Sequence, residues 1–146
     1  MRLVVEKALP VSRGVAWRHL TEPELINRWS QARLEPRRVE GRGPPAGERR
    51  VAIRFGPSTW HLDEVIETAE APSRLVYRGK ARFLVRRHRG EITLTPRDGG
   101  THLRWEVDFD LFPPGVAFPV ARLVDAQLRS SLDALAGVLA VEADAR

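Results

Sequence analysis

The 146-residue chain contains no cysteine, and it has only one methionine and one tyrosine. The lack of cysteine excludes disulfides, thiolate metal sites and cysteine nucleophiles. Long apolar runs are also missing: the opening stretch MRLVVEKALP is broken by Glu6 and Lys7, whereas a membrane-spanning helix needs about 20 apolar residues. We therefore expect a soluble cytoplasmic protein with no signal peptide and no membrane insertion.

Motifs for metal or cofactor chemistry are equally scarce. The four histidines show no paired metal-ligand spacing; they are His19, His61, His88 and His102. The chain has no phosphate-binding glycine loop, no dinucleotide fingerprint and no nucleophile elbow. We therefore predict that the protein uses neither a metal nor a cofactor.

The composition is that of an ordinary globular domain, with 42% hydrophobic and 29% charged residues. The length suits one domain that buries its own core, which we place over residues 1–146. The formal net charge of +5 comes almost entirely from arginine. Such a charge suits anionic partners, but a solvated surface is the simpler explanation. Nucleic-acid binding would need aromatics among the basic residues of runs 48–54 and 78–89 on one exposed face. The aromatics mostly have the inward parity, so we predict no nucleic-acid partner.

Two short helices are predicted after a first strand over residues 2–9. Ser12 is suited to cap the first helix, because its hydroxyl can accept from a free backbone N–H. Thr21 then begins a capping box whose second member is Glu24. Pro23 lacks the N–H that would be unpaired in a first turn. The sequence therefore predicts that one helix stops here and another starts.

Period-two alternation from about Arg33 to Leu111 predicts antiparallel strands with one apolar and one wet face. The segment Arg97-Asp98-Gly99-Gly100 predicts a hairpin turn. Counting from this turn predicts four cross-strand pairs, which are Leu94 with Leu103, Ile92 with Trp105, Gly90 with Val107, and His88 with Phe109. The same register places Glu64, Arg86 and His88 on the apolar face, where Glu64 could pair with Arg86.

A long helix is predicted from about Val116 to Ala143. Its apolar stripe has three- and four-residue spacing and contains Val120, Val124, Leu128, Leu135, Val138 and Leu139. Gln127 and Ser131 lie within or beside this stripe, one helical turn apart. An apolar sheet face must be covered. We therefore predict an α+β fold in which a curved antiparallel sheet of about six to seven strands surrounds the C-terminal helix.

The chain resembles the START-like, or SRPBCC, helix-grip superfamily of polyketide cyclase/dehydrase and lipid-transport proteins. The resemblance rests on VSRGVAWRHLTEPELINRWS, on GEITLTPRDGGTHLRWEV and on the terminal helix. The first segment holds Val15 and Trp17, which are usually adjacent in the pattern, and also the step Leu20-Thr21-Glu22-Pro23 followed by Trp29. The superfamily includes carriers, receptors, cyclases and chaperone activators, so the resemblance implies a fold rather than an activity.

One helix that grips a half-open sheet leaves space beneath it, and such spaces are mostly apolar with a few polar groups. We therefore predict a carrier or sensor that binds a small hydrophobic or amphipathic ligand in an internal cavity between the sheet and the C-terminal helix. The predicted lining consists of Gln127, Ser131, Val124, Leu128, Trp60, Tyr77, Trp105 and Phe109. We expect a monomer or a homodimer.

Two alternatives stay open. The resemblance allows an enzyme of the polyketide cyclase or dehydratase type in the same cavity. No motif assigns its catalytic residues; Arg86, His88 and Tyr77 are candidates that could polarise a carbonyl or move a proton. The second alternative is a chaperone-activator-like interaction module, which would need an exposed apolar patch and a filled interior.

Overall fold

The computed structural model describes residues 1–30, 33–37, 48–55, 57–79 and 85–145, with the side chains of 33–37, 48, 53–55 and 60 left out. The elements follow one another as β1 (Arg2–Leu9), α1 (Arg13–Thr21), α2 (Pro23–Ile26), β2 (Arg33–Arg37), β3 (Glu48–Phe55), β4 (Ser58–Glu70), β5 (Arg74–Gly79), β6 (Val85–Arg97), β7 (Gly100–Leu111), the 3-10 turn η1 (Pro114–Val116) and α3 (Ala117–Asp144).

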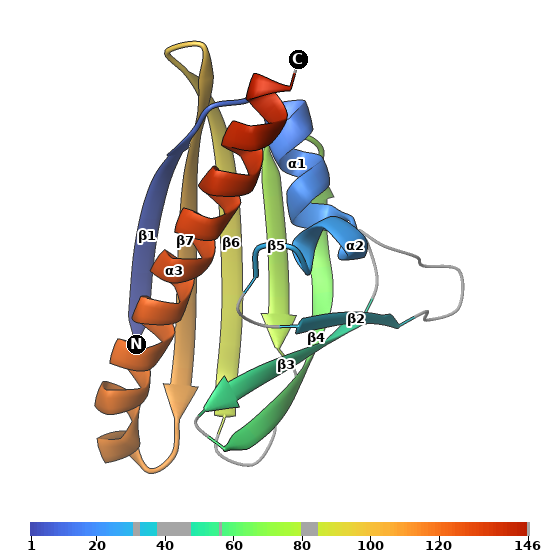
Figure 1. Cartoon of the computed structure of the whole chain (residues 1–146). Helices are drawn as coiled ribbons and strands as arrows, with labels where there is room; N and C mark the ends of the chain where they lie inside the picture. The colour runs from blue at the N-terminus through green and yellow to red at the C-terminus, as the bar shows by residue number, and fades with distance from the viewer. Residues whose placement is uncertain (31–32, 38–47, 56, 80–84, 146) are drawn as a thin grey trace.

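The strands form one seven-stranded antiparallel sheet in the order β1-β7-β6-β5-β4-β3-β2. The long helix α3 runs along one face of this curved sheet, α1 lies beside its C-terminal end, and α2 follows on the far side of α1 (Figure 1). The chain therefore has the helix-grip fold, and the predicted fold class is confirmed. No helix among the residues listed above has the length and hydropathy to cross a bilayer.

The β6–β7 hairpin has the predicted register. All four predicted pairs are present, from Leu94 opposite Leu103 at one end to His88 opposite Phe109 at the other. Asp98 and Gly99 join the strands with φ values of 49° and 77°. Positive φ at both central residues suits a two-residue hairpin turn whose twist matches that of the strands.

The two short helices are confirmed, but the predicted capping box is wrong. Ser12 does cap α1, with its Oγ 3.5 Å from the Val15 backbone nitrogen. Thr21, however, is the last residue of α1, and its hydroxyl donates to the Trp17 carbonyl at 2.8 Å. A threonine in helical conformation readily makes this backward bond. Glu22 then precedes α2 without a side-chain capping bond, and Pro23 begins the helix.

The prediction that Arg86 points to the apolar face is also wrong. Pairing between β6 and β7 shifts between Val85 and Arg87. A bulge inserts one residue and interrupts the alternation of side chains. Arg86 is therefore exposed, and its guanidinium lies 4.5 Å from the centre of the Phe112 ring.

The core divides into two hydrophobic clusters beneath α3. The larger one surrounds the C-terminal half of α3 at Leu132, Leu135 and Leu139, and it includes the buried tryptophans Trp17 and Trp29. The smaller one contains Val107, Phe109 and Ala121. Trp105 and Leu128 are partly buried and pack against both clusters. Most of the buried hydrophobic residues of the described chain therefore belong to the cluster that includes α1.

The opposite face of the sheet carries arginines that pair with carboxylates on neighbouring strands. These pairs are Arg2 with Glu106, Arg50 with Asp63, Arg74 with Glu91, Arg78 with Glu67, and Arg87 with Asp108 and Asp110. The outer sheet face, which contains many of the arginines, is thus a mixed-charge surface.

Candidate functional site

One row of directly opposed residues crosses five strands on the face that α3 covers. Arg49 on β3 faces Glu64 on β4, Glu64 faces Gly79 on β5, Gly79 faces His88 on β6, and His88 faces Phe109 on β7. Core-facing positions in such a sheet are normally apolar. A row with three ionisable side chains is therefore the most unusual feature of this surface.

The first two members of the row form a buried ion pair. Arg49 Nε lies 2.8 Å from Glu64 Oε1, and the two side chains are 17% and 5% exposed. An unpaired carboxylate at this depth would be costly, because burial removes its hydration. The expected partner of Glu64 was Arg86; the structure provides Arg49 instead.

Tyr77 lies beside this pair, in the adjacent row. It faces Gly90, where an added Cβ would stand only 2.0 Å from Tyr77 Cζ. The glycine therefore lets the phenol lie flat against β6. Trp105 Nε1 donates to the Tyr77 hydroxyl at 2.9 Å. The Arg49 guanidinium lies 4.8 Å from the centre of the Tyr77 ring.

His88 completes the group. Its ring meets Tyr77 edge to face, with centres 5.7 Å apart. His88 Nε2 is buried without a hydrogen-bond partner and lies 3.8 Å from Glu64 Oε2, which is too far for a hydrogen bond. We refer to Arg49, Glu64 and His88, together with Tyr77 from the adjacent row, as the polar row.

Burial fixes the protonation states of two members of the polar row. It lowers the pKa of His88; the nearby Glu64 carboxylate opposes this shift and Arg49 adds to it. It raises the pKa of Tyr77 well above its ordinary value, with a further contribution from Glu64. At neutral pH the row therefore contains a neutral imidazole and a neutral phenol beside one balanced ion pair.

One flank of α3 faces the part of the sheet that carries the polar row. Lys7 Nζ on β1 lies 2.6 Å from Asp133 Oδ1, so the flank with Asp133 faces β1. At about 100° per residue, Val124 lies roughly 180° and Gln127 roughly 120° around α3 from Asp133. Both side chains are half-buried. They therefore belong to the flank directed away from β1 and towards the middle strands of the sheet.

The residues predicted to line a cavity lie on the sheet face around the polar row and on the facing side of α3. On the sheet face, Tyr77 and Phe109 are buried and Trp105 is half-buried. On α3, Ser131 is 4% exposed, and Val124, Gln127 and Leu128 are half-buried. The side chain of Trp60 lies outside the described part of the chain.

Sequence reasoning missed Arg49 and Val120. Arg49 has the same strand parity as Val51, which is buried, so the alternation in β3 could have revealed its inward position. Val120 is half-buried and packs against the cluster of Phe109 and Ala121. It was assigned to the stripe of α3 but not to a site.

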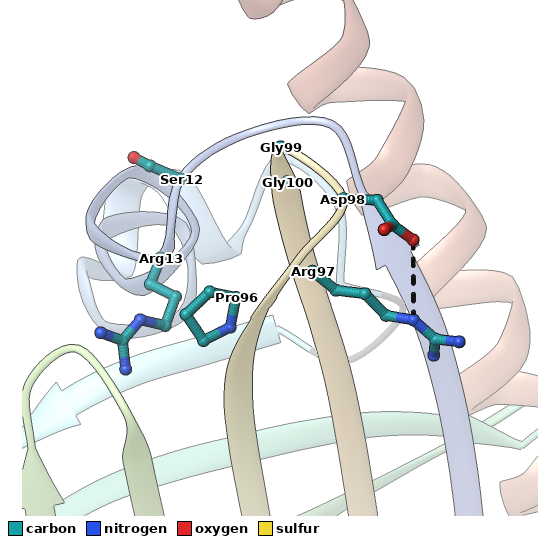
Figure 2. Close-up of a pocket in the computed structure, with 7 residues that line it drawn as sticks. All are labelled: Ser12, Arg13, Pro96, Arg97, Asp98, Gly99 and Gly100. Atoms are coloured by element: carbon teal, nitrogen blue, oxygen red, sulfur yellow. Dashed lines mark ion pairs between the residues drawn. The ribbon is translucent and has the colours of Figure 1, made fainter.

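A separate pocket of about 470 Å³ lies outside the space between sheet and helix, at the start of α1 and the tip of the β6–β7 hairpin. Figure 2 shows its lining, with the Arg97–Asp98 ion pair on the side away from Arg13. The Ser12 hydroxyl caps α1, and Arg13 donates to Ser73. These groups are already engaged, so the polar row is the better candidate site. Within the described ranges, no three histidine or carboxylate side chains gather to hold a metal ion.

Solved structures similar to this chain share its architecture. The protein MLL2253 from Mesorhizobium loti has 25% identity and a TM-score of 0.68, with 92% of this chain and 96% of that chain covered. TTHA0849 from Thermus thermophilus has 18% identity and a TM-score of 0.80, with coverage of 97% and 99%. Ara h 8.0201 has 18% identity and a TM-score of 0.74, with coverage of 97% and 98%.

No curated protein matches the chain. A family model described as polyketide cyclase / dehydrase and lipid transport matches residues 1–140. That range contains the polar row, both short helices and most of α3. The chain therefore belongs to the polyketide cyclase/dehydrase and lipid-transport family.

Proposed function

We propose that this protein is a carrier or sensor that binds a small hydrophobic or amphipathic ligand between the sheet and α3. The polar row is the observation that carries this proposal. A protein core gains little from burying an ion pair, because desolvation offsets the attraction of the charges. A ligand-binding site, in contrast, uses a few polar groups in apolar surroundings to orient the ligand.

The charge balance of the polar row favours an uncharged polar group on the ligand. Arg49 and Glu64 already satisfy each other, so neither is available to neutralise a charged group. The Tyr77 oxygen accepts from Trp105, and its own proton has no acceptor among the described residues. Tyr77 can therefore donate to a ligand carbonyl or hydroxyl, while Trp105 and Phe109 provide apolar walls.

A blocking substitution tests the proposed place of the ligand. Val124→Trp puts a large ring on the flank of α3 that faces the sheet, and Leu123→Trp puts the same ring on the exposed side, where Leu123 is 52% exposed. We expect Val124→Trp to weaken binding of the uncharged dye Nile red at least about tenfold in a fluorescence titration, which corresponds to about 1.4 kcal/mol. Leu123→Trp should bind like the parent.

Equal affinities in both tryptophan variants would contradict the proposed location. Native mass spectrometry of the freshly purified parent provides an independent measurement. A retained small molecule that Val124→Trp loses and Leu123→Trp keeps would identify the natural ligand class.

The second candidate function is a cyclase or dehydratase, and the neighbouring Tyr77 and His88 favour it. A neutral phenol can donate a proton to a carbonyl oxygen, and a neutral imidazole can accept one from carbon. Tyr77→Phe and His88→Gln would then abolish turnover, while binding would weaken by no more than the loss of one hydrogen bond. A carrier returns its ligand with unchanged mass, whereas a dehydratase returns it one water lighter.

The chaperone-activator-like alternative needs an exposed apolar patch, and on the outer sheet face the described residues offer only Val4 as an exposed large hydrophobic among arginines paired with carboxylates. The same pairing supports the proposal that the protein has no nucleic-acid partner, because paired arginines have little charge left for phosphates. The expected cytoplasmic location and the monomeric or dimeric state are part of this proposal.

A further inference from the structure

The junction between β7 and α3 exposes large apolar side chains. Phe112 follows β7 and is 51% exposed, Phe118 lies in the first turn of α3 and is 65% exposed, and Leu123 is 52% exposed. Prolines at 113, 114 and 119 are exposed among them. We call the two phenylalanines, Phe112 and Phe118, the aromatic tip. Figure 1 shows this junction at the end of the molecule opposite α1.

Such a concentration of apolar surface needs an explanation. Single exposed hydrophobic residues are normal, whereas neighbouring ones mark interaction sites. The other large hydrophobics exposed in the described part of the chain are Met1, Val4, Leu123 and Val141. Met1 lies beside the end of β7, where its amino group donates to the Phe109 carbonyl, and Leu123 lies about 140° around α3 from Phe118. Val4 is on β1, and Val141 is at the far end of α3. Among the described residues, the aromatic tip is thus the one place where two exposed phenylalanines occur close together in the sequence.

Two arginines accompany the aromatic tip. The Arg86 guanidinium lies 4.5 Å from the centre of the Phe112 ring, and that of Arg122 lies 5.9 Å from the centre of the Phe118 ring. Neither arginine has a carboxylate partner among the described residues, unlike Arg87 on the same strand as Arg86. Their positive charge is therefore available to an outside partner.

We propose that the aromatic tip docks on an anionic membrane surface without crossing it. Phenylalanine and leucine side chains enter the boundary between headgroups and acyl chains, and flanking arginines attract anionic headgroups. A protein partner would need a groove shaped to two protruding rings, whereas a lipid interface accepts them without a shaped counterpart. This inference does not depend on the proposed ligand site.

Co-sedimentation with lipid vesicles tests the docking. The parent is mixed with vesicles of phosphatidylcholine alone and with vesicles that also contain phosphatidylserine. We expect binding to the anionic vesicles, at least about tenfold weaker binding to the neutral ones, and a decrease with added salt because charges are screened. The double variant Arg86→Gln/Arg122→Gln should lose about fivefold in affinity for each arginine removed.

Matched variants distinguish membrane binding through the aromatic tip from attraction by the overall positive charge of the protein. Phe112→Ser/Phe118→Ser should abolish most binding, while Val4→Ser/Val141→Ser should leave it unchanged. Arg28→Gln/Arg97→Gln removes two exposed arginines elsewhere and should cost less than about twofold, because each lies away from the tip and attracts the lipid only weakly. Circular dichroism confirms that each variant is folded.

Two results would overturn the proposal. The first is a folded parent that binds neither kind of vesicle, which would leave an acidic protein surface as the partner to seek. The second is an equal loss in the tip and control arginine variants, which would mean that net charge alone attracts the protein. A Phe118→Trp variant adds a local readout, because its emission should shift to the blue only if the tip enters the lipid.

Discussion

Gly90 shows how a residue without a side chain positions a functional one. It faces Tyr77 across β5 and β6, and it leaves the phenol room to lie against the sheet. The ring in turn receives the Trp105 hydrogen bond and meets His88 edge to face. The arrangement of the polar row therefore depends on the absence of a Cβ at this position.

We predict that Gly90→Ala lowers the free energy of unfolding by about 1–3 kcal/mol, as overpacking in a core does. The new Cβ would meet a rigid ring that has little freedom to move aside. Urea denaturation followed by circular dichroism measures the change. In a Tyr77→Ala background the same substitution should cost much less, and an undiminished cost would show that the clash with Tyr77 is not its cause.

His88 should give the folding stability a pH dependence near neutrality. Burial lowers the pKa of His88 from its ordinary value of 6.5 in the folded protein, so between the two values the unfolded chain binds more protons. The stability is then complete above about pH 6.5 and declines as the pH falls towards the pKa of the folded state. Arg49, Glu64 and Tyr77 are the charged or titratable groups that face it.

Two measurements check this pH dependence. Urea midpoints of the parent should fall as the pH is lowered from about 7 to about 5, and those of His88→Gln should fall less steeply. An NMR titration of the His88 ring gives its pKa directly in the folded parent. A pKa below 6.5 is expected, and a value at or above 6.5 would contradict the effect of burial.

Alternation in the strands identified inward positions correctly wherever the pairing was regular. It was sufficient for His88, Gly90, Ile92 and Leu94, which pair as predicted. It failed at Arg86, because a bulge between Val85 and Arg87 leaves no mark in the order of apolar and polar residues. Arginine is also a poor indicator of a buried position, since it is buried only when its charge is paired.

Among the elements, the short helices show what local signals can and cannot specify. The break before Pro23 follows from the proline itself, because it has no N–H to continue α1. The role of Thr21 does not follow in the same way. Its hydroxyl can cap the next helix or bond backward to the Trp17 carbonyl, and the path of the chain selects the second.

In α3, Gly137 offers a simple test of helix stability. It is exposed, and an added Cβ would meet no atom within 4 Å. We predict that Gly137→Ala raises the free energy of unfolding by about 0.5–1 kcal/mol, because glycine loses more backbone entropy than alanine in a helix. Thermal and urea denaturation measure the gain. An unchanged or lower stability would indicate that this part of α3 is held by contacts that the substitution disturbs.

The molecule as a whole has two unlike ends. Near α1, the large cluster packs Leu132, Leu135 and Leu139 of α3 against buried strands and two tryptophans. At the other end, Val120 and Val124 are only half-buried and the aromatic tip is exposed. The first end therefore holds most of the buried hydrophobic core, whereas the second exposes the side chains on which the proposed lipid contact depends.

The order of elements, the helix-grip architecture and the register of the last hairpin follow from the sequence, because periodicity, turn residues and proline act over a few neighbouring positions. The polar row does not follow from the sequence, because its members come from four strands. They form one site only because strand pairing places Arg49 beside Glu64 and Tyr77 opposite Gly90. The same holds for the protonation of His88, which depends on burial by residues distant in the chain. Local patterns therefore determined the frame of this protein, and long-range packing determined the chemistry of its candidate site.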